Sequence, residues 1–428
     1  MSNQNYITNI LNLKEENLIF KENFYTEQKI KGIIHKVFEA YLSYKPINCP
    51  KCGVVFDDKF EKHGFITSNI KIPEVSGFKS ILKLHKQRYL CKHCNKAFTL
   101  STDIVNYGCF ISNNTKYKIA KDLTKKRSEK DIAIDNNVSP NTVERVMDSY
   151  YENQKLYKNN LPEVLSFYEF KSVKTADGAM SFHMCDGITG QTIDIIEDRR
   201  LNNLIKHFYY YDYKARSRVK FIIIDMYSPY VSLIKKMFPN ASIIIDKFHL
   251  TQLISRSLNK TRIMIMKKHK NHHRKFKRYW KLILKSREDL DVSKWKKFIC
   301  FNHLMTELDV VNFLINLDDE LKHTYLVYQD LLYSLKNKNY SLLNKTLHNH
   351  STNNISSYMK TSIKTLLQFL PFIKNTFLHN YHNGFIEGNN NFIKVIKRIA
   401  FGFRSFKRFK ARIMICKGLL KIKKIANA

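Results

Sequence analysis

Two pairs of cysteines stand at a spacing typical of metal ligands. Cys49 and Cys52 form one C-x-x-C segment, and Cys91 and Cys94 form the second. A two-residue spacer lets two thiolates point at one ion, and zinc takes four such ligands in a tetrahedron. We therefore expect a structural Zn²⁺ on a zinc ribbon, with a hairpin between the two pairs. Other possible donors are three histidines in or near this segment, His63, His85 and His93.

Two carboxylates occur in settings that suit the chemistry of phosphoryl transfer. Asp225 ends the apolar run Phe-Ile-Ile-Ile, and Glu387 opens a stretch of helical character that also carries Lys394 and Arg398 on the same face. Carboxylates of this kind gather divalent ions that activate an attacking oxygen and stabilise a leaving one. Asp246 ends the next apolar run and is the weaker candidate. We expect Asp225 and Glu387 to be catalytic.

A third candidate site is a helix that could read DNA. Ser139 followed by Pro140 is typical of a helix start, and apolar residues then recur at helical spacing. A shorter helix, which Ser128 can cap, comes before it, and Asn136 and Asn137 form the turn between the two, as in a helix-turn-helix. The first turns of a recognition helix reach base edges in the major groove. The DNA-contacting residues predicted on this helix are Asn141, Thr142 and Arg145.

The elements around Asp225 predict one sheet. Three consecutive strands, a helix, a strand, a helix and a strand are expected at 164–170, 179–185, 191–197, 200–211, 219–224, 228–238 and 242–245. The two late strands have the unbroken Ile/Val character of buried parallel strands. Three antiparallel strands followed by crossover units is the ribonuclease-H-like order. We expect a multidomain α/β chain whose ribonuclease-H-like catalytic core is interrupted by an all-helical insertion.

The charge of the chain indicates a polyanion partner. It has 73 Lys+Arg against 37 Asp+Glu, a formal net charge of +36. Residues 247–287 hold 14 Lys+Arg and residues 396–428 hold 11, and neither segment contains an acid. Nucleic acid is the first candidate partner and an anionic membrane surface the second. We expect Lys394, Lys397 and Arg398 to contact DNA phosphates.

The sequence also predicts the compartment and the domain limits. The first residues lack a secretory signal, and no run approaches the ~18 apolar residues of a membrane span. We expect a cytoplasmic, nucleoid-associated protein. The expected domains are a zinc-binding N-terminal region at 1–100, a helix-turn-helix at 101–155, the first part of the core at 160–250, the helical insertion at 251–375, and core completion with a basic C-terminal helix at 376–428.

Over nearly its whole length the sequence resembles insertion-sequence transposases of the ISL-three family. The resemblance rests on the cysteine pairs, the helix-turn-helix and several short segments, namely Glu169-Phe-Lys-Ser-Val, Asp225-Met-Tyr-Ser-Pro-Tyr, Ile244-Ile-Asp246-Lys-Phe-His249, Gly384-Phe-Ile-Glu387-Gly-Asn-Asn-Asn-Phe-Ile-Lys and Gly402-Phe. It implies DNA transposition at a DDE metal site. It also implies Mg²⁺ at Asp225 and Glu387 as second and third acids, and binding of terminal inverted repeats.

One position departs from the family pattern. The family has Asp immediately before Glu-Phe-Lys-Ser, whereas this chain has Tyr168. A phenol with a pKa of about 10 is a poor Mg²⁺ ligand at neutral pH. Glu169 is adjacent, but alternation along a strand should turn it away from Asp225, and Asp177 suits the following turn. The sequence therefore predicts a transposase by descent with impaired or absent catalysis.

Three hypotheses remain open at this stage. The first is an active transposase that acts on double-stranded DNA, cleaving and joining strands at its terminal repeats and at the target. The second is an inactive remnant that still binds DNA. The third, a basic protein that binds RNA or a membrane, is disfavoured by the helix-turn-helix and the Glu387 segment. Transposition requires two DNA ends to be held together, so we expect a homodimer or larger assembly on DNA.

Overall fold

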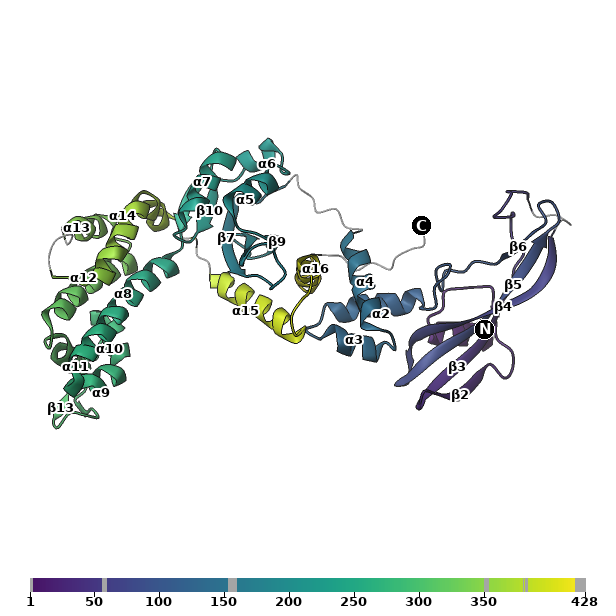
Figure 1. The fold of residues 1–428 in the computed structure, drawn as a ribbon, viewed down its shortest axis with the longest axis horizontal. Helices are drawn as coiled ribbons and strands as arrows, with labels where there is room; N and C mark the ends of the chain where they lie inside the picture. Colours follow the sequence, from purple (N-terminus) through teal and green to yellow (C-terminus); the bar gives the residue numbers. More distant parts are fainter. Residues whose placement is uncertain are drawn as a thin grey trace. The chain divides into compact units, whose positions relative to one another are not determined.

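The computed structural model describes residues 3–55, 60–152, 160–349, 354–379, 381 and 384–419, except for the side chains of residues 3–5 and of Ile386 and Glu387. The chain divides into two compact units (Figure 1). The first contains Met1–Leu156, Val173–Thr175 and Phe392–Ala428, and the second contains Tyr157–Ser172 and Ala176–Asn391.

The first unit begins with a short helix and a six-stranded sheet. These are α1 Asn3–Ile10, β1 Leu18–Ile19, β2 Tyr25–Ile30, β3 Ile33–Leu42, β4 Phe60–Val75, β5 Phe78–Cys91 and β6 Lys96–Thr99. The long hairpin of β4 and β5 joins the two cysteine pairs, as expected, and β3 lies parallel to β5. Fully buried Leu42, Ile70 and Leu82 form its core. The three strands before Cys49 were not predicted from the sequence.

A helical bundle completes the first unit. It consists of α2 Asn113–Leu123, α3 Glu129–Asp135, α4 Pro140–Glu152 and α16 Phe406–Cys416. The hydroxyls of Ser112 and Ser128 cap α2 and α3 by accepting backbone N–H groups. Ala411 and Met414 of α16 join the core of the first three helices. The segment predicted at 376–428, core completion followed by a basic C-terminal helix, is therefore divided between the units, and the apolar face of α16 is buried in the first unit.

The second unit is built on a five-stranded sheet in the order β11-β10-β7-β8-β9. Its strands are β7 Val164–Lys171, β8 Met180–Asp186, β9 Thr192–Ile196, β10 Phe221–Ile224 and β11 Ser242–Ile245. β10 is parallel to β7 and β11, whereas β8 is antiparallel to both of its neighbours. Three helices connect the strands, α5 Leu201–Phe208, α6 Tyr213–Ser217 and α7 Ser228–Met237. The single helix expected at 200–211 is thus shorter, and α6 was not predicted.

Helices make up most of the rest of the second unit. They are α8 Lys247–Lys268, α9 His273–Arg278, α10 Trp280–Leu284, α11 Glu307–Ile315, α12 Asp319–Lys336, α13 Tyr340–Asn349, α14 Ser357–Leu378 and the first part of α15 Gly384–Ile399. Two 3-10 turns, Lys270–His272 and Arg287–Asp289, and a small ladder of β12 Lys296–Lys297 with β13 Leu304–Met305 interrupt them, so the segment is not all-helical.

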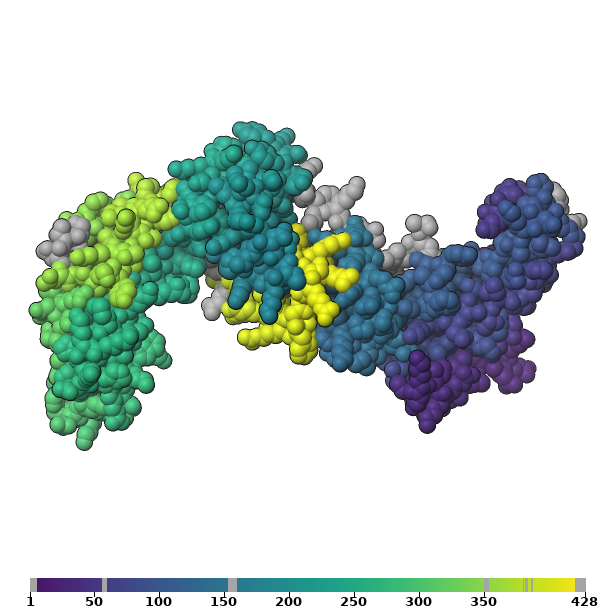
Figure 2. Space-filling view, in the orientation of Figure 1, coloured from purple at the N-terminus to yellow at the C-terminus, as the bar shows by residue number. Residues whose placement is uncertain are grey.

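The sheet and these helices share one hydrophobic core. Phe167 and Ile224 of the sheet belong to the same buried cluster as Leu258 of α8 and Leu366 of α14. The surface of this unit runs without a break from the sheet to the helices in the space-filling view (Figure 2). Within the described parts of the chain, no helix has both the length and the apolar character needed to cross a membrane.

Candidate functional site

The four cysteines of the first unit come together at one end of the β4–β5 hairpin. Their Sγ atoms all lie within 4.8 Å of one another, and the Cys49–Cys94 and Cys52–Cys91 separations are both 3.8 Å. A tetrahedron with Zn–S bonds of ~2.3 Å has edges of about 3.8 Å, so the thiols fit a zinc ion. No histidine joins this group among the residues that the structure describes.

Left-handed turns produce this convergence. Gly53 has a φ of 75° and donates its backbone N–H to the carbonyl of Cys49 at 2.8 Å, which turns the first pair back on itself. Asn95 has a φ of 53° directly after the second pair. His85, one of the alternative donors, is instead held by Glu39, whose carboxylate lies 2.7 Å from its Nε2.

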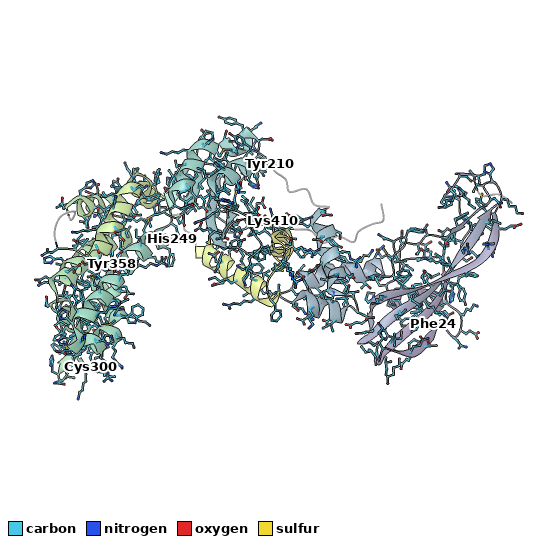
Figure 3. All side chains as sticks on the ribbon, in the orientation of Figure 1. Phe24, Tyr210, His249, Cys300, Tyr358 and Lys410 are labelled. Atoms are coloured by element: carbon cyan, nitrogen blue, oxygen red, sulfur yellow. The ribbon has the colours of Figure 1, made fainter. Side chains whose placement is uncertain are left out.

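Asp225 lies at the carboxyl end of β10. The residue is half-buried, but its Oδ1 is fully enclosed and has no hydrogen-bond partner. Burial raises the pKa of the Asp225 carboxyl to about 6, and the charge of Glu169 adds to the shift. His249, labelled in Figure 3 near the start of α8, acts in the opposite direction. An enclosed carboxylate oxygen without a donor is an acceptor suited to a cation.

Tyr168 belongs to β7, the parallel neighbour of β10. The register pairs Phe221 with Val164 and Ile223 with Ser166, and extending it by two residues beyond the paired part would bring residue 225 level with residue 168. The phenol is buried, with its oxygen 3.4 Å from Cys185 Sγ, and burial raises the pKa of Tyr168. This position therefore holds a neutral ring.

The ring is packed from both sides. On the sheet it lies 4.4 Å, between ring centroids, from His183 of β8. Phe385 of α15 packs against the same cluster. Asn389, one turn further along α15, donates to the carbonyl of Gly190 at 3.1 Å and approaches Cys185 Sγ at 3.7 Å. The start of α15 is thus fastened to the face of the sheet that carries Tyr168.

Glu169 has other partners. It forms an ion pair with Arg199 and accepts a hydrogen bond from the Tyr230 hydroxyl at 3.3 Å. Arg199 in turn lies over the ring of Tyr227, 4.5 Å from its centroid. Although strand alternation predicts that Glu169 turns away, its charge still raises the pKa of Asp225. Its carboxylate is already neutralised by a guanidinium.

The remaining acids occupy different settings. Asp246 caps α8, with its carboxylate accepting the backbone N–H of Phe248 at 3.3 Å. Asp177 lies in the turn between β7 and β8. The backbone of Glu387 belongs to α15, but its side chain lies outside the described part of the chain. Further along α15, Lys394 and Arg398 are exposed and Lys397 is half-buried.

The three residues of α4 that were predicted to read DNA differ in their exposure to solvent. Asn141 and Arg145 are exposed, whereas Thr142 is only 9% exposed and lies 3.1 Å, oxygen to oxygen, from the capping-position hydroxyl of Ser139. The prediction that Thr142 shares the exposed face is wrong. It stands one turn before Val146 and therefore lies on the buried stripe.

Two arginines of α16 form contacts that the sequence did not predict. Arg408 pairs with Glu144 and with Asp148 of α4, the latter at 3.1 Å. Arg412 is 1% exposed and donates to the backbone carbonyls of Lys125 and Arg127 at 3.1 and 2.6 Å. The apolar residues that alternate with these cations are the sequence feature that could have predicted this packing. Part of the C-terminal positive charge is therefore used inside the protein.

Comparison with known proteins agrees with this arrangement. A model of the DDE type of the ISL3 family, described as a transposase, matches residues 166–413, more than half of the chain. The chain belongs to the ISL3 transposase family. A second model, the zinc-finger of transposase IS204/IS1001/IS1096/IS1165, matches residues 45–94.

These matches contain the sites described above. The transposase match begins two residues before Tyr168 and includes Asp225 and Glu387, and the zinc-finger match includes all four cysteines. The zinc-finger match and the geometry of the thiols together support a structural Zn²⁺.

A curated protein of Lactococcus lactis subsp. lactis is similar to a smaller part of the chain. It is named ATP-dependent protease and is 44% identical over 116 residues, or 27% of this chain. The match spans 36% of that relative, about a third of its length.

Proposed function

We propose that this chain is a DNA transposase of an insertion sequence whose second unit is a ribonuclease-H-like catalytic core. The strand order β9-β8-β7-β10-β11, with β8 antiparallel, supports this assignment. Asp225 directly follows β10, as the second acid of a DDE site does, and Glu387 belongs to the later helix α15. The helices from α8 to α14 are the insertion between these two acids.

Magnesium ions gathered by carboxylates would activate an attacking oxygen on DNA. Asp225 fits a metal ligand, because its enclosed Oδ1 has no donor. Tyr168 does not fit, because it is buried and its pKa is raised, so it stays protonated and neutral. Glu169 is engaged by Arg199. We infer that strand cleavage and transfer are impaired, and that Tyr168 is a degenerate first-acid position.

The first unit is proposed to recognise terminal inverted repeats. The exposed Asn141 and Arg145 lie on the open face of α4, and Arg408 of α16 neutralises the acids on its other side. That neutralisation removes a repulsion that would oppose docking on phosphates. Lys394 and Arg398 are exposed and suited to contact the DNA backbone, with Lys397 beside them. Pairing of two DNA ends implies at least a dimer on DNA, associated with the nucleoid.

The observation that carries the proposal is the enclosed Oδ1 of Asp225, which has no hydrogen-bond partner, at the carboxyl end of a strand whose parallel neighbour β7 carries the buried Tyr168. The test measures Mg²⁺-dependent cleavage of a terminal-repeat duplex by the protein and by Tyr168→Asp, with Tyr168→Asp/Asp225→Asn as control. We expect little cleavage by the protein, more by Tyr168→Asp, and none by the double variant. Full cleavage by the unchanged protein contradicts the impairment.

The alternative is a DNA-binding remnant with no chemistry, and the buried Tyr168 favours it. Binding is measured separately, by the fall of affinity with salt. Each neutralised phosphate contributes a log-log slope of about −0.9 on duplex DNA. If Tyr168→Asp binds the repeat with such a slope but still does not cleave, the remnant is the correct description. An affinity for the repeat that does not change with salt concentration contradicts both candidate functions.

A further inference from the structure

A second candidate site lies in the helical part of the second unit, among α8, α9 and α10 (Figure 1). These helices line an open surface pocket of about 500 Å³. Its polar and aromatic lining consists of Asn259, Arg262, His273, Lys277 and Trp280, and two aliphatic side chains of α8 complete it. None of these residues belongs to the proposed catalytic site. We name it the Trp280 pocket.

One residue that lines the Trp280 pocket carries a buried positive charge. Arg262 is 6% exposed, and it donates from Nη1 to the carbonyl of Phe276 at 3.0 Å and from Nε to Asn259 Oδ1 at 2.9 Å. Burial lowers the pKa of this guanidinium. Residues 247–287 contain no acid, and among the described residues no carboxylate forms an ion pair with Arg262, so burial alone lowers its pKa. A buried cation without a counter-charge is unfavourable, so an anion in the pocket would stabilise it.

The wall of the pocket offers an aromatic platform. Trp280 is 39% exposed at the start of α10, and Lys281 Nζ lies 5.8 Å from the centroid of its ring. His273 and Lys277 are exposed one turn apart on α9 and therefore lie on the same side. An indole beside several cations matches a nucleotide, which joins a flat base to an anionic phosphate.

We propose that the Trp280 pocket binds one unpaired nucleotide of the DNA substrate, with its base on Trp280 and its phosphate facing Arg262 and Lys277. This inference rests on the proposed function, because the nucleotide comes from DNA. The nucleotide must be unpaired, since a base inside a duplex is stacked on its neighbours and cannot reach an indole. The volume lies within the range of small-molecule sites, roughly 300–1,000 Å³.

The chain contains only two tryptophans, which makes the test direct. Trp295→Phe leaves Trp280 as the only indole, and Trp280→Phe leaves Trp295, which is 64% exposed and does not line the pocket. Each full-length variant is titrated with single-stranded oligothymidine while tryptophan fluorescence is recorded. We expect saturable quenching in Trp295→Phe and none in Trp280→Phe. Equal quenching of both indoles would overturn the proposal.

Affinity supplies an independent measurement. Stacking of one base contributes about 1–3 kcal/mol, so Trp280→Ala should weaken single-strand binding by about 5- to 150-fold. Trp295→Ala is the matched control and should change it less than about twofold. Lys277→Ala alters an exposed side chain and should lower the salt dependence by roughly one phosphate contact. Unchanged affinity in Trp280→Ala refutes the assignment, and tighter binding of oligouridine than of oligothymidine refutes a DNA ligand.

The experiments distinguish a failure of the nucleotide-binding inference from a failure of the proposed function. If the protein binds a terminal-repeat duplex through α4 but Trp280 does not respond to single strands, this inference is wrong and the proposed function stands. If it binds neither the duplex nor the single strand, the proposed function itself is wrong.

Discussion

Replacing Asp225 with Asn should stabilise the second unit at neutral pH. Asn has the same shape as Asp but carries no charge. Burial and the charge of Glu169 raise the pKa of Asp225 from its ordinary value of 3.8 to about 6. The ionised carboxylate is therefore unfavourable in the folded state, in which its Oδ1 has no donor.

The magnitude follows from the size of the pKa shift. Raising the pKa of Asp225 from 3.8 to about 6 corresponds to about 3 kcal/mol of folding free energy. The side chain is only half-buried, so solvent screening reduces this to about 2 kcal/mol. The folded pKa is raised, so the carboxyl favours folding only when protonated. That contribution is complete below pH 3.8 and is lost as pH rises through about 6.

The assay is urea unfolding followed by tryptophan fluorescence, because Trp280 and Trp295 both lie in the second unit. We expect the free energy of unfolding of Asp225→Asn to exceed that of the parent protein by about 2 kcal/mol at pH 7.5. The difference should shrink to a few tenths of a kcal/mol at pH 4. Magnesium should stabilise only the parent if Asp225 binds the ion. A stability difference that does not change between pH 4 and pH 7.5 would refute the reasoning, since it would show that the carboxylate is not desolvated.

Three further predictions concern other parts of the chain. Gly190→Ala places a Cβ 2.5 Å from Phe385 at a positive φ, and should destabilise the second unit by about 1–3 kcal/mol in the same urea assay, whereas Gly388→Ala, where the space is open, should not. Arg408→Ala should reduce hydrogen-exchange protection of α4 about fivefold, corresponding to about 1 kcal/mol, whereas exposed Arg404→Ala should leave it unchanged. Removing zinc with a chelator should speed proteolysis within residues 45–94, and added Zn²⁺ should reverse the effect; resistance to proteolysis without metal would contradict a structural ion.

Local sequence patterns were sufficient for several elements. The two C-x-x-C pairs predicted the four-thiol cluster, because a two-residue spacer constrains where both sulfurs point. The apolar runs before Asp225 and Asp246 predicted parallel buried strands, since only a strand covered on both faces is apolar at every position. Ser128 predicted a helix start for the same local reason, namely a hydroxyl that accepts backbone N–H groups.

The partners of α16 required the tertiary structure. Its segment shows alternating cations and apolar residues, a pattern equally suited to a helix lying on DNA. Only packing against α2 and α4 shows that Arg412 is buried and that Arg408 pairs with Asp148. Thr142 was misplaced for a related reason, since helical spacing leaves residues at the edge of an apolar stripe undetermined.

The sequence by itself determined the kinds of chemistry available, because residue types and short spacings fix which ligands and strands can form. It also led to the prediction that Tyr168 departs from the family pattern. Only the tertiary structure decided the environment of that residue. Cys185 comes from a neighbouring strand and Phe385 from a helix some 200 positions later in the chain, and together they bury the phenol and keep it neutral. Burial depends on contacts between distant segments, which no local pattern records.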